Sequence, residues 1–61
     1  MRIEYDPKVD ALYVRLNDSA IIESEQVQPG IILDFDVSGK VVGVEVLNAS
    51  KRDTASMQVA A

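Results

Sequence analysis

The clearest pattern of apolar and polar positions lies in the segment IILDFDVSGKVVGVEVL, residues 31–47. Apolar side chains alternate with a period of two over residues 31–36, and the alternation resumes over residues 41–47. The four residues between these runs include Gly39, at a position where a hairpin turn requires positive φ. The pattern therefore predicts two antiparallel strands joined by a tight turn.

Two shorter segments near the amino terminus also alternate. Residues 2–5 predict a first strand, which the Asp6-Pro7-Lys8 run ends because proline cannot donate to a sheet ladder. Residues 11–16 predict a second strand, since their β-branched and aromatic content favours strand over helix. A polar loop follows this second strand.

The third predicted strand, residues 21–28, has a mixed pattern with no clean apolar face. An edge position explains such a pattern, because charged side chains such as Glu23 and Glu25 hinder pairing with other chains. Pro29 and Gly30 then have the form of a type II turn that leads into residues 31–47.

After Leu47 the pattern becomes helical. Ser50 with Asp53 three residues later has the form of a capping box, and residues 55–61 tolerate a helix of about ten residues. The predicted fold is therefore of the β-rich α+β class. It is a five-stranded antiparallel meander with a short carboxy-terminal helix, in one domain spanning residues 1–61.

The alternation divides the strand residues between two faces of the sheet. The face expected to form the core carries Ile3, Tyr5, Leu12, Val14, Leu16, Leu33, Phe35, Val42, Val44 and Val46. The opposite face carries four further apolar residues, Tyr13, Ile32, Val41 and Leu47. Scattered exposed apolar residues are ordinary, but a sheet solvated on one side normally has polar residues there. We interpret these four residues as the interface of a homo-oligomer.

Chain length supports association. A chain of 61 residues buries only about 60% of the surface that its unfolded form exposes. The sequence has no cysteine and no histidine, so disulfides and zinc are not available to stabilise it, and oligomerisation remains. No apolar run of signal-peptide or membrane-span length is visible, and we expect a cytoplasmic protein without membrane contact.

The charge of the chain argues against nucleic acid. Ten acidic residues against six basic ones give a net charge of -4, and such a surface repels phosphate backbones. Lys51 and Arg52 form the one local basic pair. A basic protein is the expected partner, because charge complementarity would favour it.

Candidate chemistry is limited to carboxylates. Asp34, Asp36 and Glu45 fall on ligand positions of a calcium loop within DFDVSGKVVGVE, where alternate carboxylates and a final bidentate glutamate surround the ion. A calcium loop of this kind lies between helices, whereas the period of two here predicts strands that carry Glu45 away from both aspartates. We therefore predict no catalytic, cofactor or metal site.

The segments RIEYDPKVDALYVRL and ESEQVQPGIILDFDVSGKVVGVEVLNASKR resemble the bacterial and archaeal domain-of-unknown-function family 2283, over residues 1–52. The resemblance implies a small β-rich protein with a short helical piece at its carboxyl end and no established activity. It also implies an antitoxin-like or partner-binding role, since some family members are thought to be encoded beside small toxin-like proteins.

Together these features predict a protein-binding or oligomerising module rather than an enzyme. A purely structural homo-oligomer is the first alternative. A metal-binding or carboxylate enzyme that uses Asp34, Asp36 and Glu45 is the second.

Overall fold

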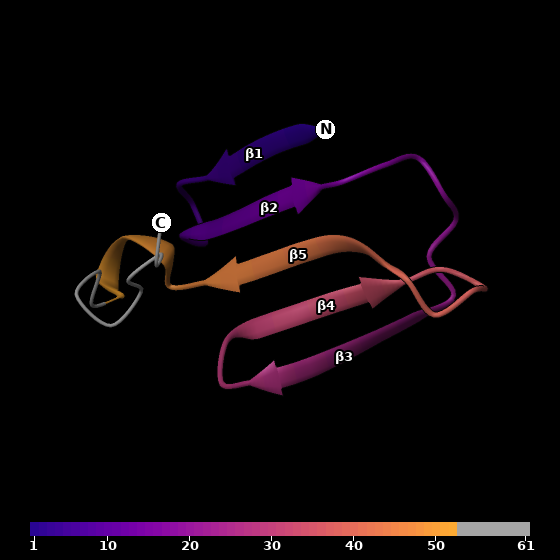
Figure 1. Ribbon diagram of the computed structural model, residues 1–61. Coiled ribbons are helices and arrows are strands. Elements are labelled where there is room, and N and C mark those ends of the chain that lie inside the picture. Colours follow the sequence, from indigo (N-terminus) through magenta and orange to yellow (C-terminus); the bar gives the residue numbers. More distant parts are fainter. Residues whose placement is uncertain (53–61) are drawn as a thin grey trace, which may run out of the picture.

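The computed structural model describes residues 1–52, which form one antiparallel sheet of five strands (Figure 1). The elements are β1 (Arg2–Asp6), β2 (Ala11–Arg15), β3 (Glu23–Gln28), β4 (Ile31–Phe35), β5 (Val41–Leu47) and a 3-10 turn, η1 (Ala49–Lys51). Each predicted strand is present, and the alternation of its residues locates its bounds to within two residues. The antiparallel sheet of the predicted fold is thus confirmed.

The predicted meander is wrong, because the strands lie in the order β1-β2-β5-β4-β3. β5 occupies the centre between β2 and β4, and residues 16–22 connect β2 to β3 across the end of the sheet (Figure 1). Within residues 1–52 the valine-rich β5 thereby gains two neighbours, whereas the acidic β3 has one. The predicted edge position of β3 is confirmed.

Both glycine turns have the predicted backbone. Gly30 has a φ of 80° and Gly39 a φ of 79°, values that cost glycine little because it has no Cβ. In the second turn the Asp36 carboxylate oxygen Oδ1 accepts the N–H groups of Ser38 at 2.9 Å and Lys40 at 3.0 Å. This Asx-type arrangement fixes the β4–β5 hairpin.

A β-bulge interrupts the pairing of β4 with β5. Asp34 lies opposite Gly43 but Phe35 lies opposite Val41, so Val42 is the extra residue. Val42 is fully buried, at 0% exposure. Because the bulge shifts the alternation by one residue, Val41 lies on the same face as Phe35, and its predicted place on the opposite face is wrong.

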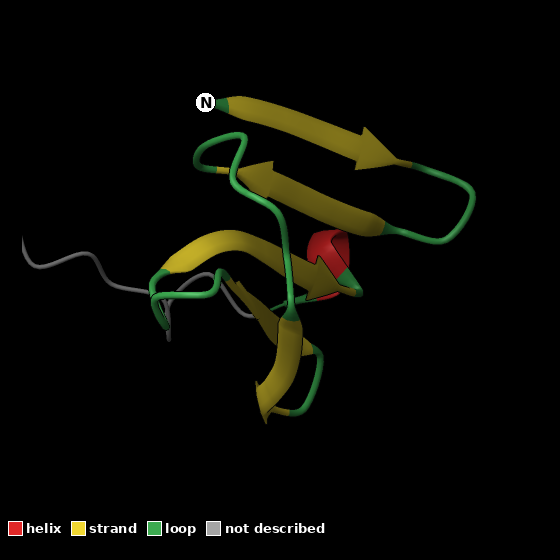
Figure 2. Ribbon diagram, turned by 90° about the vertical axis from the view of Figure 1, so that its right-hand side faces the viewer, coloured by secondary structure: helices red, strands yellow, loops and turns green. Residues whose placement is uncertain are grey.

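Apart from Val41 and from Val42, which the bulge leaves unpaired, the register confirms the predicted grouping of the apolar residues. We call this side of the sheet the apolar face. It carries Ile3, Tyr5, Leu12, Val14, Leu16, Ile31, Leu33, Phe35, Val41, Val44 and Val46. The sheet is strongly twisted, so that β3 and β4 run steeply across the direction of β1 and β2 (Figure 2). Within residues 1–52 no second layer of secondary structure covers the apolar face, and Val42 is the one apolar side chain that is fully buried.

The predicted helix is not confirmed. Ser50 does not cap a helix, but lies within η1, whose N-cap position is Asn48 with a φ of 54° and no side-chain cap. Residues 53–61, where most of the helix was predicted, lie outside the described residues. No helix in the described part of the chain is long and apolar enough to cross a membrane.

Candidate functional site

A chain of hydrogen-bonded side chains crosses the face of the sheet opposite the apolar face. We call it the polar cluster; its members are Ser24, Asp34, Tyr13 and Arg15. Asp34 is at its centre and is only 8% exposed. Its Oδ1 accepts the Ser24 hydroxyl at 2.6 Å and its Oδ2 accepts the Tyr13 hydroxyl at 2.9 Å. Both oxygens of a buried carboxylate are thus satisfied, which its burial requires.

Gly43 makes the contact between Tyr13 and Asp34 possible. Tyr13 lies on β2 and Asp34 on β4, so the tyrosine side chain must pass over β5 to reach the carboxylate. A Cβ atom at Gly43 would stand 2.5 Å from the Tyr13 hydroxyl and 2.8 Å from Asp34 Oδ2. The absence of a side chain here is therefore a packing requirement.

Arg15 links the polar cluster to the β2–β3 connection. Its Nε donates to the carbonyl of Asn17 at 2.7 Å and one terminal nitrogen donates to the carbonyl of Ser19. The other terminal nitrogen lies 3.5 Å from the Tyr13 hydroxyl, at the limit of a hydrogen bond. The groups of the polar cluster thus satisfy one another, and Arg15 holds the crossing connection.

The residues of the predicted calcium motif do not surround a common point. Asp34 belongs to the polar cluster, Asp36 binds the backbone of the hairpin turn, and Glu45 lies opposite Ile32 in the ladder. Among residues 1–52 no group of three acidic side chains is placed to hold a metal ion. The predicted hairpin is the reason, since it separates the positions that a calcium loop would bring together.

Three of the four predicted interface residues, Tyr13, Ile32 and Leu47, lie on one face of the sheet, as predicted. Ile32 and Leu47 lie on the face that carries the polar cluster, and the Tyr13 hydroxyl is occupied by Asp34. Val41 lies on the apolar face.

A second polar contact fastens η1 to the β1–β2 hairpin. Asp10, with a φ of 54°, accepts the Tyr5 hydroxyl at 2.6 Å, the Ser50 N–H at 3.1 Å and the Ser50 hydroxyl at 2.8 Å. The Ala49 N–H also donates to the Asp10 carbonyl at 3.0 Å. We call this contact the Asp10 latch. The hydrogen bond from Tyr5 lowers the pKa of Asp10, and the same bond to the carboxylate raises the pKa of Tyr5.

The Asp10 latch should weaken at both ends of the pH range. Because the pKa of Asp10 is lowered in the folded state, its contribution is complete above the ordinary carboxyl pKa of about 4 and is lost as the pH falls through the folded-state pKa. The pKa of Tyr5 is raised, so its contribution is complete below about pH 10 and is lost as the pH rises further. Thermal midpoints measured against pH should therefore fall less steeply at both ends in Tyr5→Phe than in the wild type. Curves that run parallel would contradict the latch, and Tyr13→Phe serves as a control variant with the latch intact.

Arg52 fastens the end of the described chain at the other side of β5. Its Nε donates to the Leu47 carbonyl at 3.0 Å and a terminal nitrogen donates to the Pro29 carbonyl at 2.9 Å. The arginine therefore joins the end of β5 to the β3–β4 turn, and the basic pair of the sequence has a structural role at Arg52.

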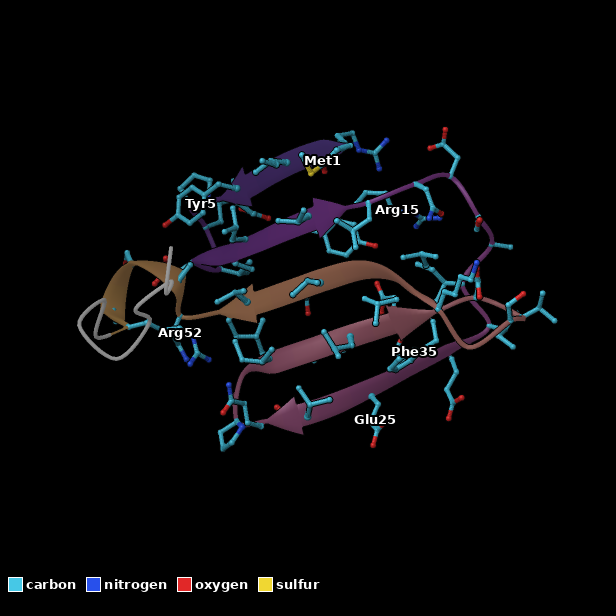
Figure 3. The ribbon with its side chains drawn as sticks, viewed as in Figure 1. Met1, Tyr5, Arg15, Glu25, Phe35 and Arg52 are labelled. Atoms are coloured by element: carbon cyan, nitrogen blue, oxygen red, sulfur yellow. The ribbon has the colours of Figure 1, made fainter. Side chains whose placement is uncertain are left out.

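The apolar face is the surface best suited to binding. Ile3 is 62%, Tyr5 48% and Leu16 42% exposed, and apolar side chains continue from β1 across β2 and β5 to β4. Glu23 and Glu25 lie opposite Phe35 and Leu33, so they border the same face at β3. Figure 3 shows Tyr5 and Glu25 at opposite edges of the sheet. A contiguous apolar surface of this kind with a charged border is typical of protein interaction sites.

Comparison with known proteins finds a matching family and a similar protein. The chain is 41% identical over 51 residues to the uncharacterized protein MJ0789 of Methanocaldococcus jannaschii. The match covers 84% of this chain but 43% of the relative, so the chain spans less than half of that protein's length. No solved structure matches significantly. The model of the family described as "protein of unknown function (DUF2283)" matches residues 2–50, and the chain therefore belongs to this family, as the resemblance of its sequence predicts.

Proposed function

We propose that the chain is a protein-binding module that presents its apolar face to a partner protein and self-associates. The observation that carries this proposal is the exposure of the apolar face, which residues 1–52 leave without a second layer. Sheets with one apolar face normally bury it against another layer. In a chain of 61 residues that has no disulfide to replace a core, the missing layer is most simply another protein.

The charges around the apolar face indicate the chemistry of the partner. Glu23 and Glu25 border the face along β3, and the whole chain has a net charge of -4. A partner with an apolar centre and lysine or arginine side chains at one margin would complement this arrangement. An antitoxin-like role, in which the module covers a basic surface of a toxin, is one form of this function.

The enzyme alternative receives less support from the contacts. Asp34 is satisfied by Ser24 and Tyr13, and Asp36 is engaged by backbone N–H groups. A general base or metal ligand needs an oxygen that is directed at substrate or ion. Both oxygens of Asp34 and the Oδ1 of Asp36 are instead engaged within the fold.

Photocrosslinking in the native host would test the proposal. A photoreactive amino acid at Leu33, on the apolar face, should form covalent adducts with a distinct protein or with a second copy of the chain. The matched control carries the same amino acid at Glu45. Glu45 lies on the opposite face and directly follows Val44, the residue that pairs with Leu33. Equal adducts from both positions, or none from Leu33 in a folded variant, would contradict the proposed binding face. The mass of each adduct distinguishes a partner protein from self-association.

A further inference from the structure

β1 is an open edge of the sheet. It pairs with β2 on one side, and no strand within residues 1–52 pairs with its other side. All five of its residues are exposed. Such an edge presents unpaired N–H and C=O groups that another strand can bind.

The directions of the backbone groups follow from the ladder. The Leu16 N–H donates to the Val42 carbonyl at 2.8 Å, so the even-numbered residues of β2 direct their backbone groups toward β5. Backbone groups of successive residues point to alternate sides in an antiparallel strand, and the odd-numbered residues of β2 therefore face β1. Their partners are Arg2, Glu4 and Asp6. Ile3 consequently directs its N–H and C=O outward, toward the open side.

We propose that two copies of the chain pair along β1 in antiparallel orientation, with the two-fold axis at Ile3. In this register Ile3 of one copy exchanges two backbone hydrogen bonds with Ile3 of the other. Arg2 of each copy lies opposite Glu4 of the other, so two pairs of opposite charge flank the axis. Within one copy the Arg2 Nε and Glu4 Oε1 are already 3.0 Å apart, which shows that both side chains reach the same region beside the strand. A shift of the axis to Glu4 would instead set Glu4 against Glu4, which is unfavourable.

The other edge of the sheet is poorly suited to self-pairing. On β3, Glu23 and Glu25 are successive residues of one face, so antiparallel pairing of two β3 strands would bring acidic side chains together. A register shift between Gln26 and Gln28 also breaks the ladder there. β1 has no register shift, and its charges are self-complementary.

Pairing along β1 would extend the apolar face from one copy to the next. Ile3 lies on that face at the edge, and in the dimer it would lie beside its counterpart. The inference thus gives the self-association of the proposed function a specific surface. It does not depend on the binding of a partner protein, because the edge of β1 and the centre of the apolar face are different surfaces. The edge is only five residues long, so we expect it to bury less than the roughly 1,200 Å² of a standard interface and to associate weakly, at micromolar concentration.

Charge exchange between β1 strands tests the register. In a dimer of Arg2→Glu, the new glutamate of each copy lies opposite Glu4 of the other copy. In a dimer of Glu4→Arg, the new arginine of each copy lies opposite Arg2 of the other copy. Each variant alone should therefore dimerise about tenfold more weakly than the wild type. In an equimolar mixture the glutamates of one variant face the arginines of the other, and dimers should return. Sedimentation equilibrium over a range of micromolar concentrations measures all four samples. Circular dichroism verifies that each variant alone is folded.

Three results would overturn the proposal: a wild type that stays monomeric at every concentration, variants that dimerise as well as the wild type, or a mixture that remains monomeric. A cysteine variant gives a second measurement, because the chain has no cysteine. Ile3→Cys should form a disulfide-linked dimer on mild oxidation, since residues that face each other in a hydrogen-bonded pair have Cα atoms about 5.5 Å apart. Glu4→Cys, the matched control, should form it much less, and the reverse order would place the axis at Glu4 and contradict the register. The outcomes of these dimerisation experiments are independent of the photocrosslinking adducts at Leu33, which test the proposed binding face.

Discussion

Replacement of Phe35 with alanine is expected to lower the free energy of unfolding by about 2–4 kcal/mol, somewhat less than for a fully buried phenylalanine. Phe35 is the only phenylalanine of the chain, and it lies opposite the bulge that buries Val42. Removal of the ring deletes the largest apolar side chain beside the bulge and leaves a gap there. A domain of this size has only about 3–9 kcal/mol of stability, so the variant should be largely unfolded at slightly elevated temperature. Urea unfolding followed by circular dichroism measures the loss.

The neighbouring residue Asp36 supplies the controls for this experiment. Asp36→Asn keeps the side-chain oxygen that accepts the N–H groups of Ser38 and Lys40, so its stability should stay close to that of the wild type. Asp36→Ala removes both hydrogen bonds and should cost about 1–2 kcal/mol. If Phe35→Ala and Asp36→Asn prove equally stable, the assignment of Phe35 to the apolar face is wrong.

The strands were predictable because their signals are local. Alternation with a period of two, a proline after the first strand and glycines at the positive φ of two turns all act within a few residues. The β4–β5 hairpin followed from the same signals. Strand order could not be predicted from these signals, because the alternation within β2 does not indicate whether β2 pairs with β3 or with β5. The order is decided by burial, which favours a valine-rich strand at the centre and an acidic strand at the edge.

The error at Val41 shows the limit of alternation inside a strand. A bulge adds one residue to β5, and every residue on the far side of it changes face relative to a simple count. Nothing in the local run of valines distinguishes Val41 from Val42. The shift is visible only in the pairing with Phe35, which depends on a different strand.

One residue of the sequence indicates the polar cluster, namely the glycine within β5. A glycine within a valine-rich run weakens the strand unless another group needs the space. Gly43 therefore indicates a close approach from a neighbouring strand. The identity of the approaching group, Tyr13, could not be derived, because it depends on the order of strands that places β2 beside β5 and β4 beyond it.

Replacement of Gly43 with alanine is expected to destabilise the protein by about 2–4 kcal/mol, combining the cost of overpacking with that of an unsatisfied buried carboxylate. The added Cβ would lie 2.5 Å from the Tyr13 hydroxyl and 2.8 Å from Asp34 Oδ2. The hydroxyl must then move away, and Asp34 loses one of its two partners. The direction of the effect is diagnostic. Glycine to alanine at an ordinary strand position, where φ is not positive, stabilises a protein by about 0.4–1 kcal/mol by restricting the unfolded chain.

A double-mutant cycle with Tyr13→Phe separates the contact from a general weakness of the strand. Tyr13→Phe alone removes the hydrogen bond to Asp34 and should cost about 1–3 kcal/mol. Once the hydroxyl is absent, the nearest atom to the new Cβ is gone, so Gly43→Ala should cost less in the Tyr13→Phe variant than in the wild type, by about 1 kcal/mol or more. Chemical denaturation of the four proteins gives this coupling. Additive effects, or a Gly43→Ala variant as stable as the wild type, would mean that Tyr13 does not cross β5 to reach Asp34.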